Sequence, residues 1–390
     1  MTPAARVQSA IDILDLVITA ARENGAAADT IFATWARGNR YAGSKDRRAV
    51  RDLVYSAIRA FGMIPKNGRA AMVGLAKRDK ELAACFDGSP YGPALIEQTE
   101  QRSARSPLAP WLAKLIDPAE HEALLTRAPF DLRVNQYSAK RDEVLTRLEG
   151  AEPIAFLPNG IRLAANIVIE KHPVWQEGVI EVQDAGSQLI ANACRAKPGM
   201  IVVDLCAGAG GKTLALAADM ANEGRLIATD TNRDRIQRLP PRAERAGAIN
   251  IETRLLNPGE ELDEFADVIG QSDVVLVDAP CSGSGTWRRN PEARWRLTTK
   301  RLEQLSATQA HVLRTGAQLV KPGGVLVYAV CSLIAREGRS QIATFLNNNS
   351  EWKAETLDLG AGRPDGAGVI LTPAHDGTDG FFVARLARRG

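Results

Sequence analysis

The sequence predicts an α/β protein in which a doubly wound, mainly parallel sheet follows a region of helices. From residue 198 onward, apolar runs typical of strands alternate with helical patterns. Runs such as Met200–Leu205 contain no alternating polar residues, which is typical of strands buried on both faces. We predict three parts: a helical domain over 1–125, a small α+β linking subdomain over 126–195 and a sheet domain over 196–390.

Composition narrows the class of protein further. The chain has 390 residues, of which 45% are hydrophobic and 24% charged, as in a soluble protein of several domains. Its five cysteines are odd in number and far apart, which argues against a secreted disulfide scaffold. Apolar runs fall short of the roughly 18 residues of a membrane span, and the start lacks the pattern of a signal peptide. We expect a cytoplasmic protein without a membrane partner.

The predicted helical domain resembles a binding domain rather than a catalytic one. Apolar residues over Val7–Ile18 and Val50–Ile58 recur at three- and four-residue steps, so each segment has one apolar helical face. Between Arg37 and Arg59, basic residues outnumber acidic ones seven to two, although the net charge of the whole chain is only +3. A polyanion such as RNA would find Arg47 and Arg48 there. A merely solvated helix face explains the same run equally well.

The linking subdomain is predicted from short segments. Asp131–Asn135 has the pattern of a strand and Ala139–Leu148 that of a helix. Further strands are expected over Ile154–Leu157 and Ile161–Ile169, although short apolar runs do not distinguish strands from buried helical segments.

The sheet domain repeats strand and helix regularly. Strands are expected at Met200–Leu205, Arg225–Thr229, Ile249–Leu256, Asp273–Asp278, Gly324–Val330 and Phe381–Leu386. Helices are expected at Gly210–Met220, Arg233–Ala246 and Thr298–Leu319. The pair Pro240-Pro241 must break or kink the second of these helices.

A glycine-rich loop joins the first of these strands to its helix. The segment Asp204–Thr213 reads DLCAGAGGKT, an acidic residue followed four positions later by GxGG. This differs from the GxGxxG of dinucleotide sites and suits a cofactor without a pyrophosphate, such as S-adenosylmethionine. Asp204 would face the cationic amine of the cofactor. A turn that merely joins strand to helix is the alternative. The predicted cofactor-binding residues of this loop are Asp204, Cys206, Ala207, Gly208, Ala209, Gly210, Gly211 and Lys212.

Two more polar residues end strands on the same side of the predicted sheet. Asp230 ends the second strand, where an acidic side chain bonds ribose hydroxyls in doubly wound folds. Its alternative role is an N-cap for the following helix. Asn257 ends the third strand and could bond the adenine edge, but Asn before Pro-Gly is equally ordinary in a turn.

Two cysteines and an aspartate indicate the reaction. Asp278-Ala-Pro-Cys281 follows one buried strand and Cys331 follows another. Ligands of open parallel sheets bind at the carboxyl ends of strands, so both thiols are expected at the ligand-binding edge. A lone cysteine is usually a small buried apolar residue, but this arrangement is hard to explain that way.

Two thiols beside a methyl donor suit methylation of a pyrimidine at carbon 5. That carbon is a poor nucleophile until a thiolate adds at carbon 6 and turns the ring into an enamine. A carboxyl group at N3 stabilises the adduct, and Asp278 is placed for this. Release requires loss of the carbon-5 proton and expulsion of the thiolate, a step in which the second thiol can help.

The motifs resemble those of a known family. DLCAGAGGKT, DAPCSGSGT, YAVCS and the final TDGFF resemble the RsmB/Nop/Sun family of RNA cytosine-5 methyltransferases. LRVN at 132–135 and VQDAGSQL at 182–189 are similar to the segment that precedes the family's catalytic domain. Ser44–Arg59 resembles part of a NusB-like RNA-binding extension, which indicates the RsmB, ribosomal RNA branch. The resemblance thus implies a Rossmann-like methyltransferase sheet, S-adenosylmethionine and an RNA substrate.

The resemblance also assigns roles to residues. It implies that Cys331 is the nucleophile and that Cys281 assists product release. The alternative is the reverse, because cytosine-5 methyltransferases acting on DNA attack with a Pro-Cys cysteine at the position of Cys281. It implies cofactor contacts from the glycine loop, Asp230, Asn257 and Asp278. The chain departs from the family pattern at four positions: Ala209 stands for proline, Val330 for threonine and Asn257 for an acidic residue, and an acidic pair is reduced to Glu337.

A second basic segment follows the Cys281 loop. Between residues 284 and 301 there are six basic residues and one acidic residue, together with two tryptophans. Arginine can hold phosphates and tryptophan can stack on an unpaired base, so an unpaired or opened RNA segment is the expected substrate. Trp295 could instead belong to the core. The predicted RNA-binding residues here are Arg288, Arg289, Arg294 and Trp295. The four histidines lack metal-ligand spacing, so we expect no metal.

These observations predict an S-adenosylmethionine-dependent RNA cytosine-5 methyltransferase acting on ribosomal RNA. One alternative keeps the cofactor but methylates a substrate other than RNA, with both cysteines structural. Another is an RNA-binding or assembly factor built on a methyltransferase fold without catalysis.

Overall fold

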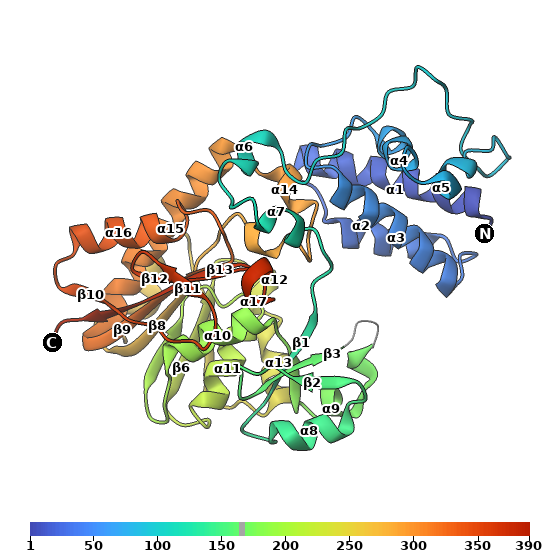
Figure 1. Ribbon diagram of the computed structural model, residues 1–390. Coiled ribbons are helices and arrows are strands. Elements are labelled where there is room, and N and C mark those ends of the chain that lie inside the picture. The colour runs from blue at the N-terminus through green and yellow to red at the C-terminus, as the bar shows by residue number, and fades with distance from the viewer. Residues whose placement is uncertain (164–167) are drawn as a thin grey trace. The chain divides into compact units, whose positions relative to one another are not determined.

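The computed structural model describes residues 1–163 and 168–390 (Figure 1). The chain forms two compact units. The helical unit comprises Met1–Thr126 and Thr286–Thr299, and the sheet unit comprises Arg127–Gly285 and Lys300–Gly390. Residues 286–299 therefore pack with helices that precede them by more than 150 positions, which the sequence analysis did not anticipate. Among the described residues, no helix is long and apolar enough to cross a membrane.

The helical unit is built around one long helix. The N-terminal helix α1 (Pro3–Glu23) buries Val7, Leu14 and Ile18, and it is capped by Asn24, whose backbone is left-handed (φ 54°). The helix α3 packs on α1 through Val50, Val54 and Ile58. The helices of this unit are α1 (Pro3–Glu23), α2 (Ala28–Gly38), α3 (Ser44–Ala60), α4 (Gly68–Ala76), α5 (Lys80–Ala84), α6 (Pro110–Ala113), α7 (Glu120–Ala123) and α14 (Ala293–Arg296).

The sheet unit begins with a small antiparallel sheet in the order β2-β3-β1-β4. Its elements are β1 (Phe130–Val134), α8 (Arg141–Arg147), β2 (Ala151–Pro153), β3 (Gly160–Leu163), a 3-10 turn (Ile169–Lys171), α9 (Pro173–Gln176) and β4 (Ile180–Val182). The predicted strand over 154–157 is wrong, because these residues form a turn whose Ile154 and Leu157 are buried by packing. The strand predicted over 161–169 ends at Leu163, and its part over 164–167 lies outside the described residues.

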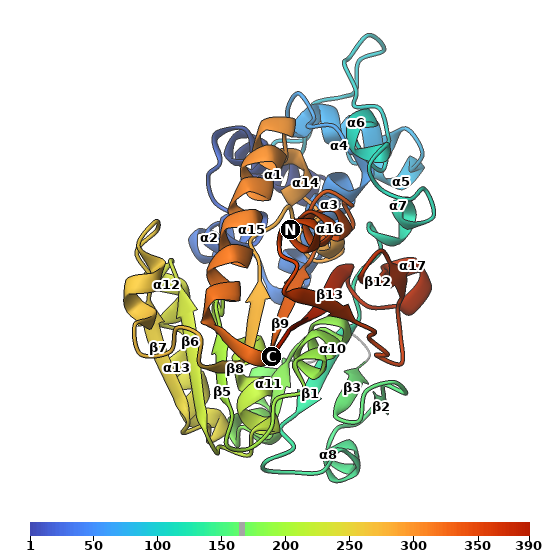
Figure 2. The same ribbon diagram turned by 90° about the vertical axis from the view of Figure 1, so that its left-hand side faces the viewer.

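The large sheet has the order β11-β12-β13-β9-β8-β5-β6-β7, with β10 paired to β13 (Figure 2). From β7 to β9 all neighbours run parallel, while β13 pairs antiparallel with β9. The predicted doubly wound, mainly parallel sheet is confirmed. Its strands are β5 (Ile201–Asp204), β6 (Arg225–Asp230), β7 (Ile251–Leu255), β8 (Ser272–Asp278), β9 (Val320–Val330), β10 (Trp352–Glu355), β11 (Arg363–Asp365), β12 (Gly368–Leu371) and β13 (Phe381–Arg388).

Helices cover both faces of this sheet. Successive residues of a strand point to opposite faces, and in the central strands both sets of residues are apolar. Val202 and Val274 face a core cluster with α10 (Ala185–Cys194) and α11 (Gly211–Asp219). Val203 and Val275 face the opposite cluster, with α15 (Thr299–Leu319) and α16 (Arg339–Asn348). The remaining helices are α12 (Arg233–Ile236), α13 (Leu239–Ala246) and α17 (Pro373–Asp376), with 3-10 turns at Glu261–Phe265 and Ser284–Thr286.

The helix expected over 233–246 is interrupted. It is divided into α12 and α13, and the break lies before the proline pair rather than at it. Pro240 and Pro241 occupy the first turn of α13, where a missing backbone N–H leaves no helical hydrogen bond unmade. The short strands β10–β12 and the helices α16 and α17 were not predicted.

Candidate active site

The glycine loop turns tightly between β5 and α11. Gly208 and Gly210 have φ angles of 57° and 84°, in the left-handed region that favours glycine. A Cβ on Gly210 would lie 2.2 Å from a methyl carbon of Leu239. The packing of Leu239 against the loop therefore leaves no room for a side chain at this position. The loop thereby brings the N-terminus of α11 to the carboxyl edge of the sheet, where the predicted cofactor would be held.

Asp204 ends β5 and is fully buried. Its Oδ2 accepts a hydrogen bond from Thr213 Oγ1 at 2.7 Å, whereas its buried Oδ1 has no partner among the described residues. Burial raises the pKa of Asp204 to about 7, although the bond from Thr213 acts in the opposite direction. An unpartnered buried carboxylate oxygen fits the predicted contact with a cationic amine.

A cavity of about 830 Å³ lies at the carboxyl ends of β5, β6, β8 and β9. Asp230, Asp278 and both predicted catalytic cysteines line it. Asp230 also accepts hydrogen bonds from the backbone N–H groups of Gly208 (2.9 Å) and Asn232 (2.7 Å), which ties the second strand to the glycine loop. Asn257 is exposed, and it lies between two residues of the cavity wall, Leu256 and Pro258.

The electrostatics of this cavity suit a cation. Burial raises the pKa of Cys206 well above its usual value, and the carboxylates of Asp278, Asp204 and Asp230 raise it further. Cys206 therefore stays a neutral thiol in a region of negative potential. A sulfonium cofactor would be stabilised here, so the residues present fit S-adenosylmethionine.

The two thiols converge as predicted. The Sγ atoms of Cys281 and Cys331 are 3.3 Å apart, because β8 and β9 are parallel neighbours whose carboxyl ends lie side by side. The hydrogen bond to Cys331, and then burial, raise the pKa of Cys281 well above its usual value. Cys281 therefore keeps its proton more firmly than an ordinary thiol, in direct contact with the sulfur of Cys331.

Asp278 has a charged partner, Lys212, which the sequence predicted only as a cofactor-binding residue. Lys212 Nζ lies 2.7 Å from Asp278 Oδ2, and the ammonium group also lies 5.6 Å from the centre of the Phe381 ring. Burial would lower the pKa of Lys212, but the charge of Asp278 and the hydrogen bond to it outweigh this and raise it. The ion pair places a donor and an acceptor side by side beside the thiols.

Other residues of the cavity were missed by sequence reasoning. Glu261 and His311 line its wall and approach each other at 3.1 Å. Neither stands in a recognisable motif, so only the packing of α15 beside the 3-10 turn at 261–265 shows that they belong to the site. Among the described residues, no group of three or more His, Cys, Asp or Glu could hold a metal ion.

The predicted RNA contacts of Arg288, Arg294 and Trp295 require correction, because all three side chains are buried. Trp295 Nε1 donates to the carbonyl of Phe61 at 2.7 Å, just after α3 ends. Arg294 donates to the carbonyls of Ile58 (2.7 Å), Arg59 (3.0 Å) and Phe61 (3.2 Å). These groups complete the end of a helix, so they are unavailable to RNA in this conformation. Arg289 is half-buried.

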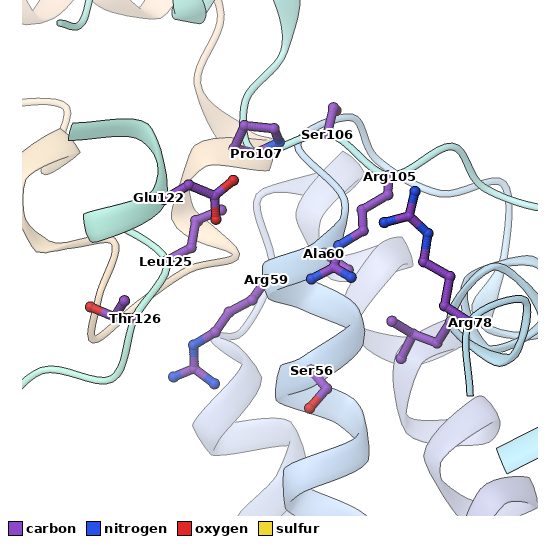
Figure 3. Close-up of a pocket in the computed structure, with 11 residues that line it drawn as sticks. Ser56, Arg59, Ala60, Arg78, Arg105, Ser106, Pro107, Glu122, Leu125 and Thr126 are labelled. Carbon is purple, nitrogen blue, oxygen red and sulfur yellow. The ribbon is translucent and has the colours of Figure 1, made fainter. Parts of the chain in front are cut away.

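Arginines instead gather at a cavity of the helical unit. This cavity, of about 660 Å³, has Arg59, Arg78 and Arg105 in its wall and one carboxylate, Glu122. Figure 3 shows Arg105 extending toward Ala60 with Arg78 beside it, and Glu122 on the opposite side. The guanidinium groups of Arg78 and Arg105 are exposed. Of the arginines predicted on α3, Arg48 is exposed and Arg47 is half-buried.

The fold and the site define a methyltransferase of the doubly wound α/β class that uses S-adenosylmethionine. Within this class the chain belongs to the 16S rRNA methyltransferase RsmB/F family, whose model matches residues 191–387. The predicted family and its cofactor are therefore confirmed.

Relatives and solved structures agree with this assignment. The probable ribosomal RNA small subunit methyltransferase B of Synechocystis is 34% identical over 301 residues, which cover 71% of this chain and 66% of that protein. The chain thus spans slightly less than two thirds of this relative's length. The crystal structure of PH0851 has a TM-score of 0.76 at 22% identity and covers 99% of both chains. A methyltransferase homologue from Pyrococcus horikoshii has a TM-score of 0.61 at 27% identity, covering 69% of this chain and 90% of that one.

Proposed function

We propose that this protein transfers a methyl group from S-adenosylmethionine to carbon 5 of a cytosine in RNA, with Cys331 as the nucleophile. The observation that carries the proposal is the pair of sulfur atoms 3.3 Å apart at the wall of the cavity, beside Asp278. A second thiol has no use in ordinary methyl transfer. It can assist release of the product when one thiol is consumed in a covalent bond to the base.

The residues around the cavity have separate roles in the proposed reaction. The thiolate of Cys331 forms a bond to carbon 6, which makes carbon 5 nucleophilic. S-adenosylmethionine, when bound, would supply the methyl group, and the electron pair of the broken carbon–sulfur bond would stay on the sulfur of the cofactor. Lys212 and Asp278 present a donor and an acceptor, and the edge of cytosine presents the complementary N3 acceptor and amino donor.

Cys281 suits the release step because its acidity depends on Cys331. The hydrogen bond between the two sulfurs is the largest cause of the raised pKa of Cys281. Once the sulfur of Cys331 is bonded to carbon 6, that cause is removed, and Cys281 gives its proton to water more readily. The Cys281 thiolate then accepts the carbon-5 proton. The carbon–sulfur bond breaks as the ring double bond returns, and Cys331 leaves as a thiolate.

Ribosomal RNA is the substrate that the family name and the relatives' names support. We propose that Arg78 and Arg105 contact its phosphates, because both are exposed at one cavity of the helical unit. Arg47 and Arg48 on α3 and Arg289 remain further candidates. With ribosomal RNA as substrate, we expect the protein in the cytoplasm.

The test is a trapped intermediate. Cys281→Ala is expected to form a covalent protein–RNA adduct that survives a denaturing gel, because the adduct forms but is not released. Cys331→Ala should form none, and both variants should lose turnover. Cys85→Ala, on a cysteine of the helical unit, is the matched control and should behave as the wild type. An adduct trapped by Cys331→Ala would reverse the two roles.

The same variants separate the alternatives. Turnover that persists in Cys331→Ala would favour methylation of a substrate other than RNA, with structural cysteines. RNA binding without any methyl transfer or cofactor binding would favour a non-catalytic assembly factor. Radiolabelled S-adenosylmethionine with RNA that lacks the modification identifies the methylated nucleotide.

A further inference from the structure

Glu337 is a fully buried acidic residue in the segment between β9 and α16. It does not line the cofactor cavity, so it has no contact there with a substrate. A buried carboxylate is costly unless donors surround it, and its partners therefore show what it holds in place.

The carboxylate of Glu337 joins the two cysteine loops. Its Oε1 accepts the backbone N–H of Ser282 at 2.8 Å, and its Oε2 accepts the Ser282 hydroxyl at 2.5 Å. The same Oε2 accepts the hydroxyl of Ser332 at 2.5 Å. Ser282 directly follows Cys281 and Ser332 directly follows Cys331. One side chain thus holds the residue next to each thiol.

Two further hydrogen bonds anchor Glu337 to rigid elements. Gln309 Nε2 on α15 donates to Glu337 Oε1 and to the carbonyl of Pro280, both at 2.9 Å. The hydroxyl of Tyr328 on β9 donates to the backbone carbonyl of Glu337 at 2.7 Å. Pro280 precedes Cys281 directly, so the network holds the Cys281 loop from both sides.

The cysteines lie beyond the last paired residues of their strands, Asp278 and Ala329. Adjacent strands are about 4.8 Å apart, whereas the two sulfurs are 3.3 Å apart. Besides Glu337, a backbone bond from the Gly285 N–H to the carbonyl of Cys331 (3.1 Å) and a contact between the Ser282 and Ser332 hydroxyls (3.3 Å) join the two cysteine segments. We propose that Glu337 is a positioning residue that links Ser282 to Ser332 and thereby sets the separation of the two thiols. The inference rests on the proposed function, in which both thiols act on one base.

The experiment uses the full chain with Glu337→Ala and with the size-conserving Glu337→Gln. Glu303→Ala is the matched control, because Glu303 is an exposed glutamate of α15 in the same unit. Methyl transfer to RNA gives kcat and KM. The separation of the thiols is read independently with phenylarsine oxide, which bonds two close thiols with loss of water. Its release by 2-mercaptoethanol is timed, and Cys331→Ala gives the background.

We expect kcat to fall about 100-fold in Glu337→Ala with KM for RNA unchanged within twofold, since about 1 Å of misplacement costs this much. Release of the arsenical should be at least about tenfold faster, because a looser thiol pair closes the ring less favourably. Glu337→Gln, which retains one acceptor oxygen, should lie between Glu337→Ala and the wild type in both readouts. A purely structural role would lower the folded fraction, and with it the apparent kcat at unchanged KM, but it would leave arsenical release from the folded protein unchanged.

Two results would overturn the inference: arsenical release that is unchanged in Glu337→Ala, or a kcat within threefold of the wild type. If the wild type methylates no RNA at all, the proposed function fails, and the arsenical measurement still decides whether Glu337 sets the separation of the thiols.

Discussion

Replacing Arg294 by methionine is expected to destabilise the helical unit by about 3–5 kcal/mol. The guanidinium donates to the carbonyls of Ile58 and Arg59 at the end of α3 and to that of Pro291, and burial of each without a partner costs about 1 kcal/mol or more. The Phe61 carbonyl keeps its bond from Trp295. The positive charge also lies at the negative end of the helix dipole, which contributes up to about 2 kcal/mol. Burial lowers the pKa of Arg294 to about 9, so the group is still charged at pH 7.

Hydrogen exchange gives the local stability without assuming that both units unfold together. Amides of α3 (Ser44–Ala60) that exchange through opening of the helical unit should exchange about 100- to 4,000-fold faster in Arg294→Met. Amides of the sheet unit serve as an internal reference. Arg48→Met is the matched control, since Arg48 is an exposed arginine of α3. It should change α3 exchange by less than about twofold, because surface substitutions are typically within about 0.5 kcal/mol.

The outcome also decides between a structural and an RNA-binding role for the segment over 286–299. Glu292 accepts a hydrogen bond from the N–H of Ala28 at the start of α2, and Arg296 donates to the carbonyl of Ala20 near the end of α1. The negative charge of Glu292 thus lies at the positive, N-terminal end of α2, and the positive charge of Arg296 lies at the negative, C-terminal end of α1. Unchanged α3 exchange in Arg294→Met, together with weaker RNA binding, would refute this reasoning and restore the RNA contact.

Two further predictions concern ligands. As the pH rises toward 7, affinity for S-adenosylmethionine should rise about tenfold per pH unit, because Asp204, whose burial raises its pKa to about 7, must lose a proton to face the cationic amine. Affinity should fall again above about pH 8, where an α-amino group loses its charge. Calorimetry across pH should show this slope in the wild type, and a slope that persists in Asp204→Asn would contradict the assignment. Replacing Arg78 and Arg105 together by alanine should weaken RNA binding and reduce the salt slope by roughly 1.4, at about 0.7 per phosphate contact. Filter binding at several salt concentrations measures it, with Arg102→Ala as the control. An unchanged slope would exclude this cavity as an RNA site.

The local sequence determined the strands of the parallel sheet, the glycine loop and the cysteine pair, but not the short strands β10–β12. An uninterrupted apolar run such as Val274–Val277 is compatible with burial on both faces, and the carboxyl ends of parallel strands share one edge. The meeting of Cys281 and Cys331 follows from these rules once their strands are neighbours. Short-range chemistry was therefore enough to indicate the class of reaction.

Tertiary structure alone decided the partners of charged and aromatic groups. The sequence could not show that Arg294 and Trp295 complete a helix more than 200 positions earlier, because basic residues near a catalytic loop fit RNA equally well. Nor could it show that Glu337 reaches Ser282 as well as Ser332. The backbone pattern follows from local apolar periodicity. The hydrogen-bond partner of a buried polar group depends on which distant segments exclude water around it.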